Sequence, residues 1–90
     1  MGKNNLWIVK FSSEKKIQPH FPNFTNFSAA KTYCNSVLSD YGKKKHLDGG
    51  EILHVVNGEI ISKVTVDYVG FDELYYSDVH ILHEKIPYKG

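Results

Sequence analysis

Three consecutive lysines, Lys43, Lys44 and Lys45, are followed after three residues by a pair of glycines. Lysine ammonium groups bind phosphate oxygens, so the lysines are candidate phosphate-binding residues whose affinity would fall with added salt. The alternative is a solvated loop, because cations are also favoured beside the negative C-terminal end of a helix. Phosphate-cradling glycines lead into a helix, whereas this pair leads into a predicted strand. We therefore expect a loop that ends a helix.

The histidines raise the question of a metal site. His80 and His83 are three residues apart, a spacing that suits one face of a helix. In a strand they would point to opposite faces and would not share an ion. His54 could approach either one across a sheet, but no spacing rule supplies a third ligand. We expect neither a metal nor a cofactor.

No nucleophile is paired with a base by its spacing. Cys34 lies on the apolar stripe of a predicted helix, where cysteine usually behaves as a small buried hydrophobe. Asp72 and Glu73 are adjacent and their side chains diverge, so they do not form a spaced acid–base pair. Serine, histidine and aspartate occur without a turn that would expose a nucleophile. We expect no catalytic residue and a protein that is not an enzyme.

Aromatic and acidic side chains are interleaved in the segment "VDYVGFDELYYSD", residues 66–78. The candidate partner-binding residues are Tyr68, Phe71, Asp72, Glu73, Tyr75, Tyr76 and Asp78. Tyrosine supplies rigid contact area and is enriched in protein interfaces, and the acids would suit a basic groove on a partner. The alternative is that the aromatic side chains complete the core, because so short a chain needs their volume.

A helix positions the lysines. Apolar residues recur at helical spacing on one stripe, namely Ala30, Tyr33, Cys34, Val37, Leu38 and Tyr41. Asn26 or Ser28 would cap the first free amide groups of this helix. Gly42 would allow the left-handed turn that ends it.

The alternating segment "LWIVKF" predicts a strand over about residues 5–12. The segment that follows contains two prolines and is expected to be an ordered loop. Phe21, Phe24 and Phe27 are expected to pin this loop onto the core.

Asn57-Gly58 lies between two β-branched runs and predicts a hairpin with strands near 50–56 and 59–69. A type I′ turn and a three-residue bulged loop give registers that differ by one residue. We favour the bulged register because it pairs Glu51 with Lys63.

The C-terminal part completes the fold. "FDELYYSD" is expected to be a connection or a single helical turn, "DVHILHEKI" a last strand, and "PYKG" a frayed tail. The predicted order is β-α-β-β-β in one α+β domain over residues 1–90, with one amphipathic helix packed on a mainly antiparallel sheet.

Composition narrows the function classes. The chain has 90 residues, of which 41% are apolar, and a single cysteine that forms no internal disulfide, so we expect a cytoplasmic protein. No apolar run approaches the roughly 20 residues of a membrane span, and the start lacks the apolar core of a signal peptide, so we expect no membrane. All 11 basic residues are lysine, which argues against sequence-specific DNA reading.

Charge is divided along the chain. Residues 1–46 carry eight lysines and two acids, a net charge of +6, whereas residues 47–90 carry three lysines and eight acids, a net charge of −5. Because halves of a sequence need not be halves of the folded molecule, this division shows segregation of charge along the chain only.

The stretch "NFSAAKTYCNSVLSDYG" running into "GGEILHVVNGEII" resembles the small inhibitor proteins of phages and mobile elements, including anti-CRISPR proteins. The likeness is one of layout over about residues 6–69: a short strand, a helix that opens with a Ser-x-Ala-Lys pattern, here Ser28 to Lys31, and a hairpin. It implies a non-enzymatic protein in the host cytoplasm that blocks a larger host protein or ribonucleoprotein complex by occupying a surface.

Our leading interpretation is a protein-binding module, an inhibitor of a host defence or nucleic-acid-processing complex. The first alternative is a nucleic-acid-binding protein that uses Lys43, Lys44 and Lys45 with Lys3, Lys10, Lys15 and Lys16. The second is a binder of a small nucleotide-like ligand, with histidine and tyrosine around a pocket. Edge strands in so small a sheet can also pair between copies, which would give a homodimer.

Overall fold

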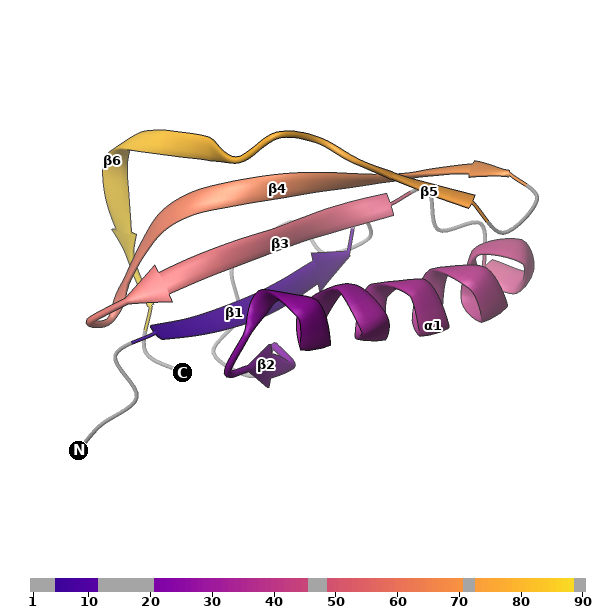
Figure 1. The fold of residues 1–90 in the computed structure, drawn as a ribbon, viewed down its shortest axis with the longest axis horizontal. Coiled ribbons are helices and arrows are strands. Elements are labelled where there is room, and N and C mark those ends of the chain that lie inside the picture. The colour runs from indigo at the N-terminus through magenta and orange to yellow at the C-terminus, as the bar shows by residue number, and fades with distance from the viewer. Residues whose placement is uncertain (1–4, 12–20, 46–48, 71–72, 89–90) are drawn as a thin grey trace.

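The computed structural model describes residues 5–11, 21–45, 49–70 and 73–88, with the backbone alone for residues 39–45, 68 and 70. The elements are β1 (Asn5–Phe11), β2 (Asn23–Phe24), α1 (Phe27–Lys45), β3 (Gly49–Val56), β4 (Glu59–Gly70), β5 (Glu73–Tyr76) and β6 (His80–Pro87). One helix lies against a curled antiparallel sheet, which confirms the predicted α+β class (Figure 1). The predicted order lacked the two shortest strands, β2 and β5.

The long strand β4 organises the sheet. The strand order is β2-β1-β3-β4-β5, and β6 also pairs with β4. β5 pairs with the C-terminal part of β4 and β6 with its N-terminal part, so the two lie one after the other along the same strand. Together β5 and β6 form one side of the sheet, which we call the β5–β6 edge (residues 73–87).

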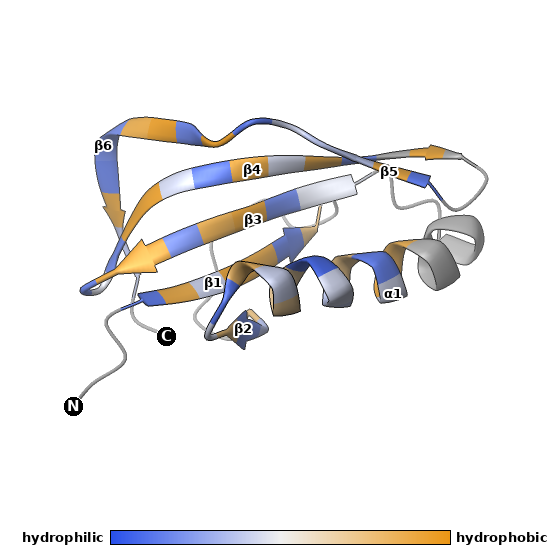
Figure 2. Cartoon of the chain, in the orientation of Figure 1, coloured by the Kyte–Doolittle hydropathy of each residue, from blue (hydrophilic) through white to orange (hydrophobic). Residues whose placement is uncertain are grey.

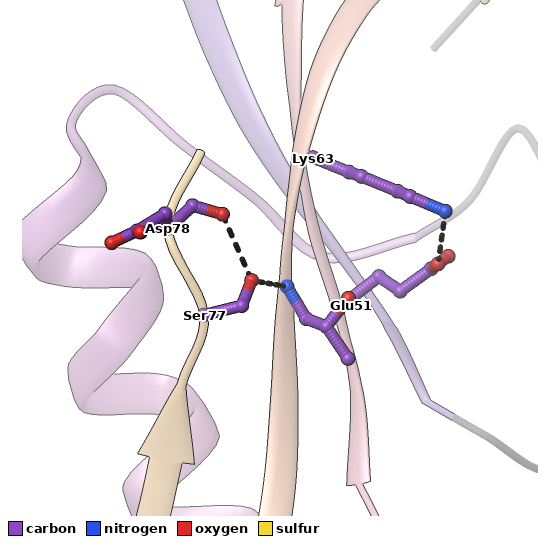
Figure 3. Close-up of polar contacts among 5 residues, drawn as sticks. Glu51, Lys63, Ser77 and Asp78 are labelled. Atoms are coloured by element: carbon purple, nitrogen blue, oxygen red, sulfur yellow. Dashed lines mark hydrogen bonds and ion pairs between the residues drawn. The ribbon is translucent and has the colours of Figure 1, made fainter. Parts of the chain in front are cut away.

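Ser77 joins β5 to β6 at this side. The Thr65 amide donates a hydrogen bond to Ser77 Oγ over 2.9 Å, and the Ser77 amide donates one to the Thr65 carbonyl over 2.9 Å. Ser77 Oγ in turn donates to the carbonyl of Asp78 over 2.9 Å (Figure 3). The backbone N–H and C=O groups of Thr65 therefore both stay hydrogen-bonded at the point where the neighbouring strand changes from β5 to β6.

The helix forms where its apolar stripe predicts. Ala30, Cys34 and Leu38 are fully buried, and the amide of Ala29 donates to Oδ1 of Asn26 over 2.8 Å as an N-terminal cap. The predicted end at Gly42 is wrong, because α1 continues to Lys45. Glycine inside a helix costs about 1 kcal/mol, whereas lysine is a good helix former and is favoured at the negative end.

Each face of the sheet has its own apolar cluster. On the α1 side, Val9, Ile52, Val64 and Val66 pack with the helix stripe. On the opposite side, the cluster comprises Ile8, Phe21, Leu53, Val55, Ile60 and Tyr88. Figure 2 shows two apolar stretches along β3 separated by a polar one, as expected for a strand that has an apolar cluster on each face. The predicted packing of the phenylalanines on the core is confirmed, since Phe21 belongs to the second cluster while Phe24 and Phe27 pack against the first. The loop over residues 12–20 that they were expected to pin lies outside the described residues.

The hairpin turn has two residues. Val56 pairs with Glu59, and Asn57 and Gly58 have φ angles of 50° and 80°, as a type I′ turn requires. The bulged register that we favoured is wrong, because Glu51 faces Thr65. The expected ion pair forms nevertheless across a diagonal, with Lys63 Nζ 3.4 Å from Glu51 Oε2 (Figure 3).

A β-bulge at Ile61 shifts the register of β4 against β3, and on the other side of β4 the register is interrupted at the same place by residues 82–85 of β6. Residues two apart in a strand normally share a face. Here Ile60 belongs to the cluster opposite α1, whereas Ser62 pairs with His54 on the α1 side. Counting from Ile60, a regular strand would place Ile61 on the α1 side, and the bulge places Ser62 there instead.

Two predictions for the C-terminal part are wrong. The segment around Leu74 forms β5 rather than a helical turn. Pro87 ends β6, and Tyr88 is buried and donates its amide hydrogen to the Gly58 carbonyl over 2.8 Å, so the chain is not frayed there. Burial of the Tyr88 side chain in the second cluster accounts for this order.

Candidate functional site

Exposed apolar side chains gather at one side of the molecule. Among the described residues, the exposed large apolar side chains are Val69, Tyr75, Val79, Ile81 and Ile86, with exposed fractions between 41% and 67%. All five lie between positions 69 and 86, on β5, β6, the link between them and the adjoining end of β4. Such a concentration is a feature of interaction surfaces, since single exposed apolar residues are normally scattered.

β6 is exposed over almost its whole length. Only Leu82 is half-buried within the strand, and every other residue of β6 is exposed. Among the described strands, β6 pairs with β4 alone, so its outer backbone groups face no described strand. A strand of this kind can pair with a strand of another chain.

Carboxylates accompany these apolar groups. Glu73, Asp78 and Glu84 are exposed along the β5–β6 edge, together with Lys85. The edge therefore carries more negative than positive side chains. The C-terminal part of the acidic half, β5 and β6, thus forms one side of the sheet, while α1 packs near β1, β2 and β3.

The structure describes the side chains of four of the seven predicted partner-binding residues, and three of these four are exposed. Glu73, Tyr75 and Asp78 are exposed, as expected. Tyr76 is half-buried and packs against the core on the α1 side. Phe71 and Asp72 lie outside the described residues, and of Tyr68 only the backbone is described, paired with Leu74 in β5.

Burial changes the chemistry of two groups near α1. It raises the pKa of the Cys34 thiol to about 12, so this cysteine stays protonated at neutral pH and its predicted burial is confirmed. It likewise raises the pKa of Tyr76 to about 12, with the charge of a Cys34 thiolate as the second cause. The Tyr76 hydroxyl donates to Asn35 Oδ1 over 2.9 Å, and Lys31 Nζ lies 4.7 Å from the centre of its ring. Tyr76 therefore belongs to the core rather than to a binding surface.

The lysine segment is the last turn of α1 rather than the expected loop. Only the backbone of Lys43, Lys44 and Lys45 is described, so their phosphate-binding role stays a prediction. The glycine pair that follows has a structural explanation, because a Cβ atom at Gly50 would lie 2.5 Å from the Lys10 carbonyl oxygen. Gly50 thus permits the close approach of β1 and β3.

A pocket of about 240 Å³ opens on the α1 side of the sheet, beyond the N-terminal end of the helix. It is lined by Trp7, Phe27, Ile52, His54, Ser62, Val64 and Val79. Ile52, Ser62 and Val64 are buried and form its floor, whereas Val79 is exposed and forms part of its rim. The pocket therefore joins the core to the β5–β6 edge.

One wall of the pocket is a stacked pair of rings. The ring centres of Trp7 and His54 are 4.3 Å apart, and the ring planes differ by 5°. His54 Nε2 donates to Asn5 Oδ1 over 3.0 Å, which orients the imidazole. Burial lowers the pKa of His54, so the wall is uncharged at neutral pH.

His54 and His80 do not converge. His54 lies on the α1 side, whereas His80 pairs with Lys63 on the opposite side of the sheet. Within the described ranges, no group of three or more His, Cys, Asp or Glu side chains is arranged to hold a metal ion.

A wider depression of about 280 Å³ lies at the other end of the sheet. Its charged residues are Lys10, Glu51 and Asp67, and Glu51 is already paired with Lys63. Phe11 and Gly49 line it at points where the chain continues into segments 12–20 and 46–48, outside the described residues. The pocket beside Trp7 is the better-defined candidate.

Two parts of the candidate site were not found in the sequence. The sequence places Val79 and Ile81 in a last strand, and Ser62 is one polar residue within a β-branched run. The only sequence signal was the apolar character of Val79 and Ile81 beside His80 and the acidic Asp78. That signal does not distinguish a buried strand from an exposed edge.

Comparison with known proteins gives no matching family model, no matching curated protein and no matching solved structure. Among the described residues, no helix combines the length and the apolar character needed to cross a membrane.

Proposed function

We propose that this chain is a non-enzymatic protein-binding module that uses the β5–β6 edge to contact a partner protein. The observation that carries the proposal is the position of the exposed apolar side chains, all of which lie between residues 69 and 86 within the described part of the chain. Covering them would remove apolar surface from water, which is the main favourable contribution to most protein association.

The backbone of the edge supports the same proposal. A partner strand beside β6 would accept and donate the hydrogen bonds that its outer backbone groups do not make to any described strand. The exposed carboxylates of Glu73, Asp78 and Glu84 favour a partner with lysine or arginine beside its apolar contact residues. The partner is thus a protein whose contact surface is apolar at its centre and basic around it.

The narrower predictions rest on the sequence alone. Inhibition of a host complex and a cytoplasmic location follow from the resemblance and the composition, and they stay predictions. Lysine-driven nucleic-acid binding also stays a prediction, because its main side chains lie outside the described residues.

The test is affinity capture from a nuclease-treated bacterial lysate with three forms of the chain. The first is the wild type, the second carries V79T and I81T, and the third carries S36A as a control on the exposed face of α1. Threonine keeps the β-branched shape and strand propensity but reduces the apolar surface. The proposal expects one protein that wild type and S36A retain and that the double variant loses.

Two outcomes would contradict the proposal. Equal capture by all three forms would show that the edge is not the contact surface. Recovery of nucleic acid alone, released by added salt, would transfer the function to the lysines. Sedimentation of the purified chain identifies the remaining case, in which a second copy covers the edge and the double variant is monomeric.

A further inference from the structure

We propose that the pocket beside Trp7 receives one aromatic side chain of the partner, a side chain that carries a hydrogen-bonding atom. This inference rests on the proposed function and names the central contact of the same surface. Tyrosine and tryptophan side chains have the required chemistry, because each combines a large ring with one polar group.

The pocket has the size of a single ring system. Its volume is about 240 Å³. An engineered cavity of about 150 Å³ in another protein holds benzene, and sites for drug-sized ligands start near 300 Å³. One substituted ring therefore matches the space.

The floor of the pocket contains a polar group that favours a polar occupant. Ser62 is only 5% exposed, and its hydroxyl makes no hydrogen bond to any described residue. Among the described residues, no fully buried side-chain oxygen or nitrogen lacks a partner, so this hydroxyl is still reached from the pocket that it lines. An occupant that donates or accepts a hydrogen bond would pair with it, whereas an apolar ring of the same size makes no such bond.

The pocket exists because a small residue interrupts a row of large ones. Trp7, His54, Ser62 and Ile81 are successive cross-strand neighbours from β1 to β6. The bulge at Ile61 brings Ser62 into this row, and α1 begins at Phe27, so the helix does not cover the gap. The resulting space has an aromatic wall, which favours an aromatic occupant in an offset or edge-to-face arrangement.

Val79 connects the pocket to the proposed contact surface. Its side chain lines the pocket, is 61% exposed, and lies in the link between β5 and β6. A partner lying along the β5–β6 edge would therefore reach the pocket without crossing α1. Large aromatic residues that enter central pockets typically dominate the affinity of an interface.

The test uses p-cresol, which is the side chain of tyrosine without its backbone, and toluene, which lacks the hydroxyl group. Each is titrated into the full chain while two-dimensional NMR follows the backbone amide and indole signals. We expect saturable shifts from p-cresol that centre on Trp7, the only tryptophan, and on Ser62. S62A should weaken p-cresol about tenfold, should leave toluene unchanged, and is compared with S36A as a control.

The spectrum of each variant also shows whether it is folded. Shifts spread over the whole surface, or equal p-cresol affinity in wild type and folded S62A, would overturn the inference. If S62A does not fold, the affinities of p-cresol and toluene for the wild type are compared instead. Equal affinities of the two compounds would also overturn the inference, because they would show that the hydroxyl group of the occupant contributes nothing.

Competition identifies the source of the ring. If p-cresol reduces capture of the partner protein, the occupant is a partner side chain, as proposed. If p-cresol binds the pocket without reducing capture of the partner protein, the pocket does not hold a side chain of the partner. Its occupant would then be a free small molecule. Failure of the proposed function is a separate result, since it appears as capture that is unaffected by V79T and I81T.

Discussion

The hydroxyl of Tyr76 donates a hydrogen bond to Oδ1 of Asn35 over 2.9 Å and so joins β5 to α1. The preceding residue, Tyr75, pairs with Asp67 and is 61% exposed. Adjacent residues in a strand point to opposite faces, so one tyrosine belongs to the core and the other to the surface. The two side chains should therefore respond differently to the same substitution.

Y76F should lower the free energy of unfolding by about 1 kcal/mol, because it removes one hydrogen bond and keeps the ring. Y75F should change it by less than about 0.5 kcal/mol, as is usual for a surface substitution. Urea denaturation followed by circular dichroism measures both values. Equal effects of the two variants would contradict the assignment of Tyr76 to the core.

The side chain of Ser77 should stabilise the connection between β5 and β6. S77A leaves the half-buried amide of Thr65 without its hydrogen-bond acceptor, which should cost about 1–3 kcal/mol of stability. S36A, on an exposed position of α1, is the control. Hydrogen exchange gives the sharper measurement, since the Thr65 amide should exchange faster in S77A, and an unchanged rate would disprove the role of Ser77 Oγ.

A larger apolar side chain at position 62 should fill part of the pocket beside Trp7, and it should therefore stabilise the fold and abolish the proposed aromatic-binding site. S62V replaces the Ser62 hydroxyl with methyl groups that pack against the apolar floor of the pocket, and it should gain about 1 kcal/mol. A gain of that size raises the melting temperature by roughly 4–8 °C in a domain of this length. S62A should gain less, because it leaves the space empty. A lower melting temperature for S62V would mean that the pocket cannot accept the added methyl groups.

His54 should make stability depend on pH. Its pKa is lowered from 6.5 by burial, so the unfolded chain binds a proton at a pH where the folded chain does not. The stabilising effect of the neutral imidazole is complete above pH 6.5, and it is lost as the pH falls through that value toward the lower folded pKa. Its described contacts, Trp7 and Asn5, carry no charge.

The measurement is the melting temperature of wild type and H54Q as a function of pH. Wild type should lose stability relative to H54Q as the pH falls below 6.5. Subtraction of the two curves removes the contribution of the other titrating groups. Parallel curves would contradict a buried, neutral His54.

Local patterns in the sequence identified the elements that depend on their own residues. The stripe of Ala30, Cys34 and Leu38 predicted the helix and its buried face, and Asn57-Gly58 predicted the hairpin. The four residues of β5 are too few for a periodic signal, so β4 supplies the pairing that makes them a strand.

The candidate site depends on relationships that a single sequence does not contain. The bulge at Ile61 decides which face Ser62 occupies, and it results from how β4 pairs with β3. The exposure of Ile81 likewise follows from the position of β6 at the side of the sheet. Sequence alternation alone predicts one buried face for such a strand.

The central claim is that the β5–β6 edge binds a partner protein. It is tested most directly by the affinity of the purified partner for the wild-type chain and for the variant that carries V79T and I81T, measured by calorimetry at fixed salt. We predict a loss of about tenfold or more, which corresponds to about 1.4 kcal/mol, with no change in S36A. Affinities that agree within about twofold among the three forms would contradict the claim.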